Sequence, residues 1–173
     1  GQLGDGTTTS KTHFVQVVSG DVKAVTAGGY HSMILKQDGS VWSTGSNSYG
    51  QLGIGFLVAD SITFHKVVGR GVTAIAAGAF HSLILRKDGS VWTAGRNKFG
   101  QLGYGSTIFK AIFTQVIRVG TKALAAGHLH SRIMTRNGAV WAAGSNAHGQ
   151  LGDGTTTSKT HFVQVVSGDV KAV

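Results

Sequence analysis

The segment GQLGDGTTTSKTHFVQVVSGDVKAV occupies residues 1–25 and recurs unchanged at residues 149–173. Its first four residues, GQLG, also begin at Gly50 and Gly100, so successive occurrences are 49, 50 and 49 residues apart. Residues that recur at such a period are first explained by a repeated architecture. The sequence therefore divides into three units and a partial fourth that copies residues 1–25, with the bounds 1–49, 50–99, 100–148 and 149–173.

Each unit contains short runs rich in β-branched and aromatic residues, a composition typical of β-strands. In the first unit these runs are FVQVV, VKAVT, SMILK and SVWST, at Phe14–Val18, Val22–Thr26, Ser32–Lys36 and Ser40–Thr44. The dipeptides that join the third run to the fourth are Asp38-Gly39, Asp88-Gly89 and Asn137-Gly138. Such dipeptides predict type I′ hairpin turns, which need two positive φ angles. No window shows a helical period with caps. The chain is therefore predicted to be all-β.

Four short antiparallel strands in every ~50 residues is the cadence of a β-propeller blade. The elements GQLGDGTTT, V-x-x-V-x-x-G, HS-x-x-L and DG-x-V-W-x-x-G-x-N together resemble the regulator of chromosome condensation repeat, over essentially the whole chain. The resemblance implies a propeller, usually of seven blades, in which the first and last strands close the ring. Family repeats commonly carry a proline before the apolar run. Here that position holds Phe14, Phe64 and Phe113, and the chain contains no proline.

Three full blades with partial ends leave a propeller open. Unpaired blade edges invite pairing with other chains. We therefore expect copies of the chain to associate as a homo-oligomer, by closing a ring between chains or by stacking head to tail. The identical ends suit this arrangement, because the terminal segment of one copy has the sequence expected at the same place in another. The alternative is that the sequence is part of a longer single-chain propeller.

Bulk composition limits the class of protein. A chain of 173 residues with 41% hydrophobic residues can form a modest core. The absence of cysteine excludes disulfides and thiolate metal sites, and no apolar run approaches the ~18 residues of a membrane span. Sixteen Lys and Arg against seven Asp leave a net charge of +9, which favours acidic partners such as nucleic acid. These basic residues are expected on both faces of the propeller, which weakens the prediction of a nucleic-acid partner.

One histidine recurs in the HS motif of every unit, as His31, His81 and His130. Three imidazoles that converged on one point could bind a metal ion. Recurrence once per unit favours a structural role instead, in which each histidine and its serine satisfy backbone groups within their own blade. The sequence shows no nucleophile elbow, phosphate-binding loop or carboxylate pair. We therefore predict no metal, no other cofactor and no enzymatic activity.

Some positions depart from the repeat in ways that indicate contact surfaces. Residues 55–64 and 108–113 are more apolar than the TTTSKT loop that they replace, and apolar residues in a long loop indicate a contact patch. The candidates there are Phe56, Leu57, Ile108 and Phe109. Arg132 replaces Met33 and Leu83 at an apolar strand position, and partial exposure is favoured over a role as an interface anchor. Basic residues next to the expected turns complete the candidate set: Arg86, Lys87 and Arg136.

The sequence thus predicts a non-enzymatic β-propeller scaffold or protein-binding module that associates with itself through open blade edges. The family resemblance implies two alternatives. One is a chromatin-binding guanine-nucleotide-exchange factor for a small GTPase, although the inserted element and basic tail on which that activity depends are not found here. The other is a secreted enzyme inhibitor or adhesin of the propeller type. Likeness of fold alone does not choose among these three functions.

Overall fold

The computed structural model describes residues 1–55 and 59–168, which form twelve β-strands and no helix. The strands pair in three four-stranded antiparallel sheets, each with neighbouring strands in chain order. The first sheet comprises β1 (Val22–Ala27), β2 (His31–Lys36), β3 (Val41–Gly45) and β4 (Ser61–Val68). The second comprises β5 (Val72–Ala77), β6 (His81–Arg86), β7 (Val91–Gly95) and β8 (Lys110–Ile117). The third comprises β9 (Thr121–Ala126), β10 (His130–Thr135), β11 (Val140–Gly144) and β12 (Lys159–Val166).

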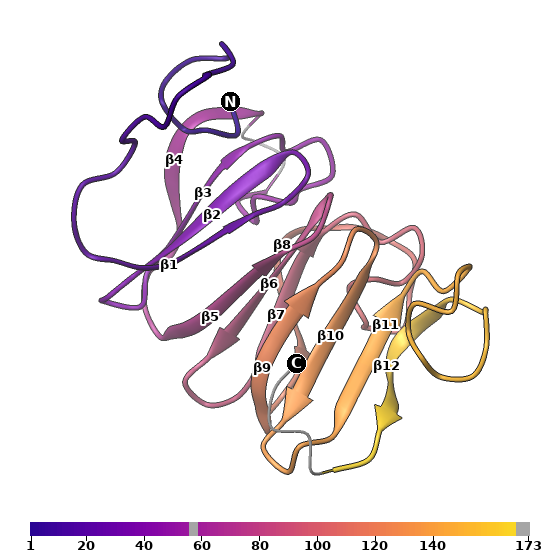
Figure 1. Cartoon of the computed structure of the whole chain (residues 1–173). Helices are drawn as coiled ribbons and strands as arrows, with labels where there is room; N and C mark the ends of the chain where they lie inside the picture. The colour runs from indigo at the N-terminus through magenta and orange to yellow at the C-terminus, as the bar shows by residue number, and fades with distance from the viewer. Residues whose placement is uncertain (56–58, 169–173) are drawn as a thin grey trace.

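Each sheet is one propeller blade, and the three blades follow one another without closing into a ring (Figure 1). The all-β prediction with four short antiparallel strands to a blade is therefore confirmed. No helix within residues 1–55 and 59–168 has the length and apolarity needed to cross a membrane.

The hairpin turn between the second and third strands of a blade differs from the predicted type I′ turn. In the first blade, Gly39 N–H donates to the Lys36 carbonyl at 3.0 Å, and Lys36 N–H donates to the Ser40 carbonyl at 2.9 Å. Gly39 has a φ of 79°, whereas Asp38 is not among the positive-φ residues. This is a three-residue loop, a type I turn followed by a left-handed glycine. The Asp38 carboxylate accepts the Ser40 N–H at 2.8 Å, which fixes the turn.

The two identical end segments adopt different structures. The sequence KTHFVQVV forms β12 at Lys159–Val166, where it pairs with β11. The same letters at residues 11–18 form no strand, so the strand predicted at Phe14–Val18 is wrong for the first copy. The physical reason is the neighbourhood, since β11 lies beside β12 and the described chain provides no such strand beside residues 11–18. Figure 1 shows the two segments at opposite ends of the array of blades.

The apolar core lies between neighbouring blades. Between the first and second blades, side chains that include Met33 and Leu35 pack with Ile84 in one buried cluster. Between the second and third blades, Leu83 and Phe162 belong to a second cluster, which also contains Leu85, Val91, Ile133 and Ala143. Each side chain of this size that is removed from water stabilises the fold by ~1.5–3 kcal/mol. One face of each blade therefore needs the next blade to cover it.

Candidate functional site

A chain of hydrogen bonds joins the first blade to the second. His31 Nε2, on β2, lies 2.8 Å from the Ser82 hydroxyl on β6. That hydroxyl donates its proton to the carbonyl of Gln51 at 2.7 Å. Because the only proton of the hydroxyl is used in this way, the histidine donates from Nε2 and the serine oxygen accepts. The repeated histidine therefore bonds to the next blade, and the expectation that it acts within its own blade is wrong.

The junction between the second and third blades repeats this arrangement. His81 Nε2 lies 3.0 Å from the Ser131 hydroxyl, which donates to the Gln101 carbonyl at 2.7 Å. A glycine makes room for the imidazole, since a Cβ atom on Gly78 would lie 2.1 Å from a carbon of the His81 ring. The histidine and serine of the HS motifs and the glutamine carbonyl of the GQLG motif therefore form the same hydrogen-bonded junction between each pair of neighbouring blades.

Burial keeps the junction histidines neutral. Both His31 and His81 are fully buried, and their Nδ1 atoms have no partner among the described residues. Burial lowers the pKa of His31 to about 4. Burial, together with smaller effects of the neighbouring histidines, lowers the pKa of His81 to about 3. No group of three potential metal-ligating side chains is found within the part of the chain that the structure describes.

Each end of the array carries one part of an incomplete junction. At the third blade, His130 occupies the histidine position and is partly buried, and burial and the nearby Arg132 lower its pKa. Arg132 is also partly buried and donates from Nη2 to the Gln150 carbonyl at 2.7 Å. At the first blade, Ser32 occupies the serine position of the repeat, and Val25 is 72% exposed. The counterpart of Val25 in the second blade, Ile75, packs against the first blade.

The face that carries the GQLG loops displays aromatic and apolar side chains. Ile108 and Phe109, which precede β8, are 66% and 46% exposed. Arg96 lies over the rings of Tyr49 and Phe80, at 5.1 and 5.5 Å from their centroids. Phe56 and Leu57 lie outside the described residues. This group of Arg96, Tyr49 and Phe80, the Arg96 cluster, was not predicted from the sequence. The aromatic residues that precede the HS motif in two units, Tyr30 and Phe80, were a signal that could have revealed it.

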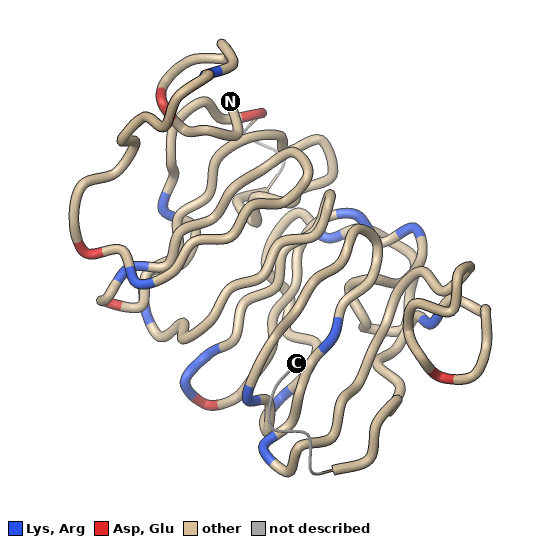
Figure 2. The backbone as a smooth tube through the Cα atoms, viewed as in Figure 1, with Lys and Arg blue, Asp and Glu red and all other residues tan. Residues whose placement is uncertain are grey.

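The other basic candidates lie at the hairpin turns. Arg86 ends β6, with its guanidinium 4.6 Å from the centroid of the Trp92 ring. Lys87 and Arg136 lie in the turns that follow β6 and β10, where their backbone N–H groups donate to the carbonyls of Gly71 and Gly120. Figure 2 shows Lys and Arg at both ends of the strands. The candidate residues therefore do not form one site. The basic residues lie at the hairpin turns, Ile108 and Phe109 lie on the face of the GQLG loops, and Arg132 lies on β10 of the third blade.

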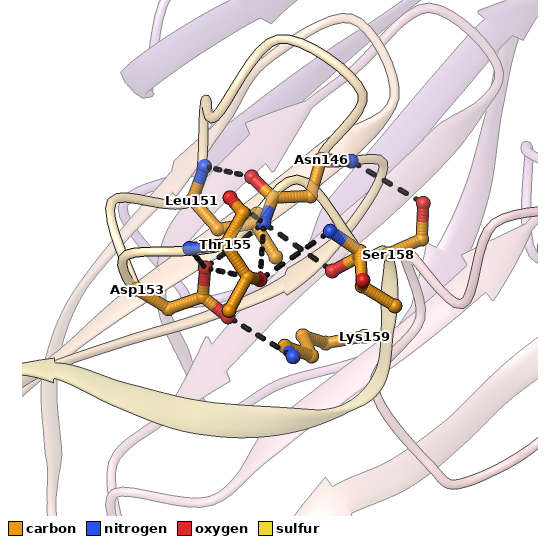
Figure 3. Close-up of polar contacts among 7 residues, drawn as sticks. Asn146, Leu151, Asp153, Thr155, Ser158 and Lys159 are labelled. Atoms are coloured by element: carbon orange, nitrogen blue, oxygen red, sulfur yellow. Dashed lines mark hydrogen bonds and ion pairs between the residues drawn. The ribbon is translucent and has the colours of Figure 1, made fainter.

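The loop before β12 is held by a network around Asn146 (Figure 3). The Asn146 side-chain amide donates to an Asp153 carboxylate oxygen and to the Thr155 carbonyl, both at 2.9 Å. Asp153 also accepts the Thr155 hydroxyl at 2.8 Å and forms an ion pair with Lys159 at 3.2 Å. Hydrogen bonds from Thr155, with help from Lys159 and Asn146, lower the pKa of Asp153 to about 2. The carboxylate is therefore charged wherever the protein is folded near neutral pH.

The identical loop near the start of the chain keeps part of this network. Asp5 accepts the Thr7 hydroxyl at 2.9 Å and forms an ion pair with Lys11 at 3.2 Å. No asparagine of the described residues takes the role that Asn146 has in the third blade. The local contacts therefore survive in both copies, while the asparagine contact is found, among the described residues, in the second copy alone.

Comparison with known proteins gives a consistent match to one family of repeats. A model of the "Regulator of chromosome condensation (RCC1) repeat" matches residues 22–51, 72–101 and 122–150. A second model of the same repeat matches residues 38–85 and 88–131. No significant match was found among curated protein sequences.

Several solved structures resemble the chain. The crystal structure of Prp20p from Saccharomyces cerevisiae, whose published subject includes binding to Gsp1p and histones, has a TM-score of 0.74 and 25% identity. The match covers 85% of this chain and 39% of Prp20p. Yeast RCC1 (Prp20) bound to Kap60 gives a TM-score of 0.73, with 25% identity and coverage of 85% and 37%. Human WBSCR16 has a TM-score of 0.74 and 21% identity, and the match covers 84% of this chain and 40% of WBSCR16. At this identity the match supports the fold alone. The chain thus spans about two fifths of these structures.

Proposed function

The chain belongs to the regulator of chromosome condensation (RCC1) repeat family, and we propose that it is a non-enzymatic protein-binding propeller module that associates with copies of itself through its open ends. The observation that carries the proposal is the pair of complementary ends. The first blade presents the face that the second and third blades bury against a preceding blade. The third blade presents the opposite face. In the first and second blades, Met33 and Leu83 lie on this face and pack against the next blade, and Arg132 occupies the same position in the third blade.

Exposure of Val25 supports an unfilled position at the first blade. Val25 pairs with Ile34 across β1 and β2, as Ile75 pairs with Ile84 in the second blade. Both isoleucines of the second blade contribute to the cluster between the blades, whereas Val25 is 72% exposed. Val25 is thus an exposed apolar side chain at a position that is packed against another blade in the second blade, and such exposure favours contact with another protein.

Sedimentation velocity of two matched variants tests the proposal. Val25→Lys places a charge on the face of the first blade, and Val119→Lys places the same charge at a valine that is 68% exposed and precedes β9. We expect the unaltered chain and Val119→Lys to associate equally as concentration rises, and Val25→Lys to stay monomeric to at least tenfold higher concentration. Equal association of the two variants, or an unaltered chain that never associates, would overturn the proposal.

Similarity to Prp20p favours a second candidate function. The published work on that structure concerns binding to Gsp1p and histones, and this chain carries a net charge of +9, which would attract acidic surfaces. Under this alternative the chain would accelerate the release of fluorescent GDP from a small GTPase in a stopped-flow assay. Release at the intrinsic rate at every concentration of the chain would exclude it. No feature of the described residues favours the secreted inhibitor or adhesin, which stays a prediction.

A further inference from the structure

We infer that residues 11–18 of one copy pair with β11 of a second copy, in the place that β12 occupies within its own chain. This inference rests on the proposed self-association and names the segment that carries it. The partner of residues 11–18 is a second copy of this chain. Residues 11–18, which lack a neighbouring strand, are identical in sequence to β12, which pairs with β11.

Residues 1–6 already occupy the place of a loop from a preceding blade. Gly55 N–H, in the loop of the first blade, donates to the Ala111 carbonyl on β8 of the second at 2.8 Å. Gly6 N–H makes the equivalent bond to the Ile62 carbonyl on β4, at 2.9 Å, and Asp5 forms a β-bridge with Thr63. The start of the chain is therefore docked on the first blade as if it were the loop that comes before the fourth strand of an earlier blade.

The residues that follow this loop lack the environment that makes them a strand. Phe14 is fully exposed, whereas its counterpart Phe162 is 9% exposed and belongs to the cluster between the second and third blades. Val15 and Val17 are also exposed. A strand-forming sequence with exposed apolar side chains and unpaired backbone is a template for pairing with another chain.

The third blade of another copy supplies each missing partner. Its β11 provides a strand in the required register, with Trp141 opposite Gln164 and Ala142 opposite Val163. Its Asn146 provides the amide that holds the loop (Figure 3). Because residues 1–18 and 149–166 are identical, the replacement of β12 by residues 11–18 reproduces the contacts that β12 loses.

Exchange also completes the junction between blades. In the donor copy, residues 19–21 lead directly into β1, so insertion beside β11 brings the first blade of the donor against the third blade of the acceptor. His130 of the acceptor then faces Ser32 of the donor, as His31 faces Ser82 within the chain. The Gln150 carbonyl that Arg132 contacts is replaced by the carbonyl of the identical Gln2. The additional junction between the two copies favours the exchanged form, and each acceptor has a free donor segment for the next copy.

Disulfide trapping of the full chain tests the exchange, because the protein contains no native cysteine. The test variant is Val15→Cys with Ala142→Cys, and the matched control is Val163→Cys with Ala142→Cys. Opposed residues of an antiparallel pair lie close enough for such a bond. Ser43 and Thr93 occupy the position of Ala142 in the other blades, so a cysteine fits there. Under mild oxidation we expect the test variant to form covalent species at successive multiples of 17.9 kDa.

The control variant should stay at the mass of one chain, because its two cysteines meet within the third blade. Phe162→Ala added to the test variant, which weakens the resident β12, should raise the yield of covalent oligomer several-fold, and Phe14→Ala should lower it several-fold. A test variant that remains at the mass of one chain overturns the exchange. If such a variant still associates by sedimentation velocity, the proposed self-association stands and occurs by another contact. If it does not associate, both proposals fail.

Discussion

Protonation of the histidines at the blade junctions should destabilise the protein at mildly acidic pH. His31 and His81 have pKa values of about 4 and about 3 in the folded protein, against 6.5 for an unperturbed histidine. Between these values the unfolded chain binds protons that the folded chain does not, so stability falls as pH falls. The full contribution of each histidine is present above about pH 6.5 and decreases as the pH approaches the folded pKa.

The size of the effect follows from these shifts. At about pH 5 the solution is 1.5 pH units below the unperturbed pKa of 6.5, and one unit corresponds to ~1.4 kcal/mol, so each histidine costs about 2 kcal/mol. The two junctions together lose about 4 kcal/mol, a large part of the 5–15 kcal/mol that is typical of a folded domain. The lowered pKa values of Asp38 and Asp88 start from 3.8, so these carboxylates act at lower pH. The pKa of His130 is also lowered by burial, so this histidine adds to the loss, equally in the unaltered chain and in variants at the junctions.

Urea unfolding at about pH 7.5 and pH 5, at low protein concentration, measures this loss. The unaltered chain should lose at least about 4 kcal/mol of unfolding free energy between the two conditions. His81→Gln keeps a side-chain amide that can donate to Ser131 but does not titrate, so this variant should lose about 2 kcal/mol less than the unaltered chain. A stability that does not change over this range, or a variant as sensitive to pH as the unaltered chain, would refute the reasoning.

Four further substitutions test the packing of the array. Ser131→Ala leaves His81 Nε2 and the Gln101 carbonyl unpaired at a buried junction, and should lower the unfolding free energy by about 2 kcal/mol in urea; an unchanged value would mean that the hydrogen bonds do not hold the blades. Phe162→Ala should lower the unfolding free energy by about 3–5 kcal/mol. Phe14→Ala changes the same residue of the identical segment at a fully exposed position, and should change the stability of the monomer by less than ~0.5 kcal/mol. Equal effects of the two variants in thermal unfolding would contradict the burial of Phe162 and the exposure of Phe14. Asn146→Ala should cost about 2 kcal/mol and speed amide hydrogen exchange in residues 153–157, and unchanged exchange there would show that the loop does not depend on Asn146.

The repeat makes most of the fold predictable from the sequence. In the first unit, runs of β-branched and aromatic residues indicated β1, β2 and β3 to within a residue at each end, and the period of about 50 indicates their counterparts in the other blades. The run expected for the fourth strand begins three residues after the start of β12, at Phe162. The prediction failed at residues 11–18, because an identical sequence has the same propensity wherever it occurs. Whether it becomes a strand depends on β11, which is beside β12 and not beside residues 11–18. Local propensity is a weak guide where tertiary pairing decides.

Contacts between blades were harder to predict than the blades. A motif that recurs in every unit shows that His31 is structural but not that Ser82, 51 residues away, is its partner. The hairpin turn was misassigned because Asp-Gly also suits a type I turn followed by a left-handed glycine, and the Ser40 N–H bond to Asp38 selects that form. The Arg96 cluster was missed because its aromatic partners come from the first and second units and meet only when the blades pack.

The molar mass of the unaltered 173-residue chain, measured by light scattering over a wide concentration series, tests most directly whether the array has complementary open ends. The proposal predicts a mass that rises above 17.9 kDa as concentration increases, to a fixed multiple if copies close a ring and without limit if they form a filament. A mass of 17.9 kDa at every concentration would contradict it.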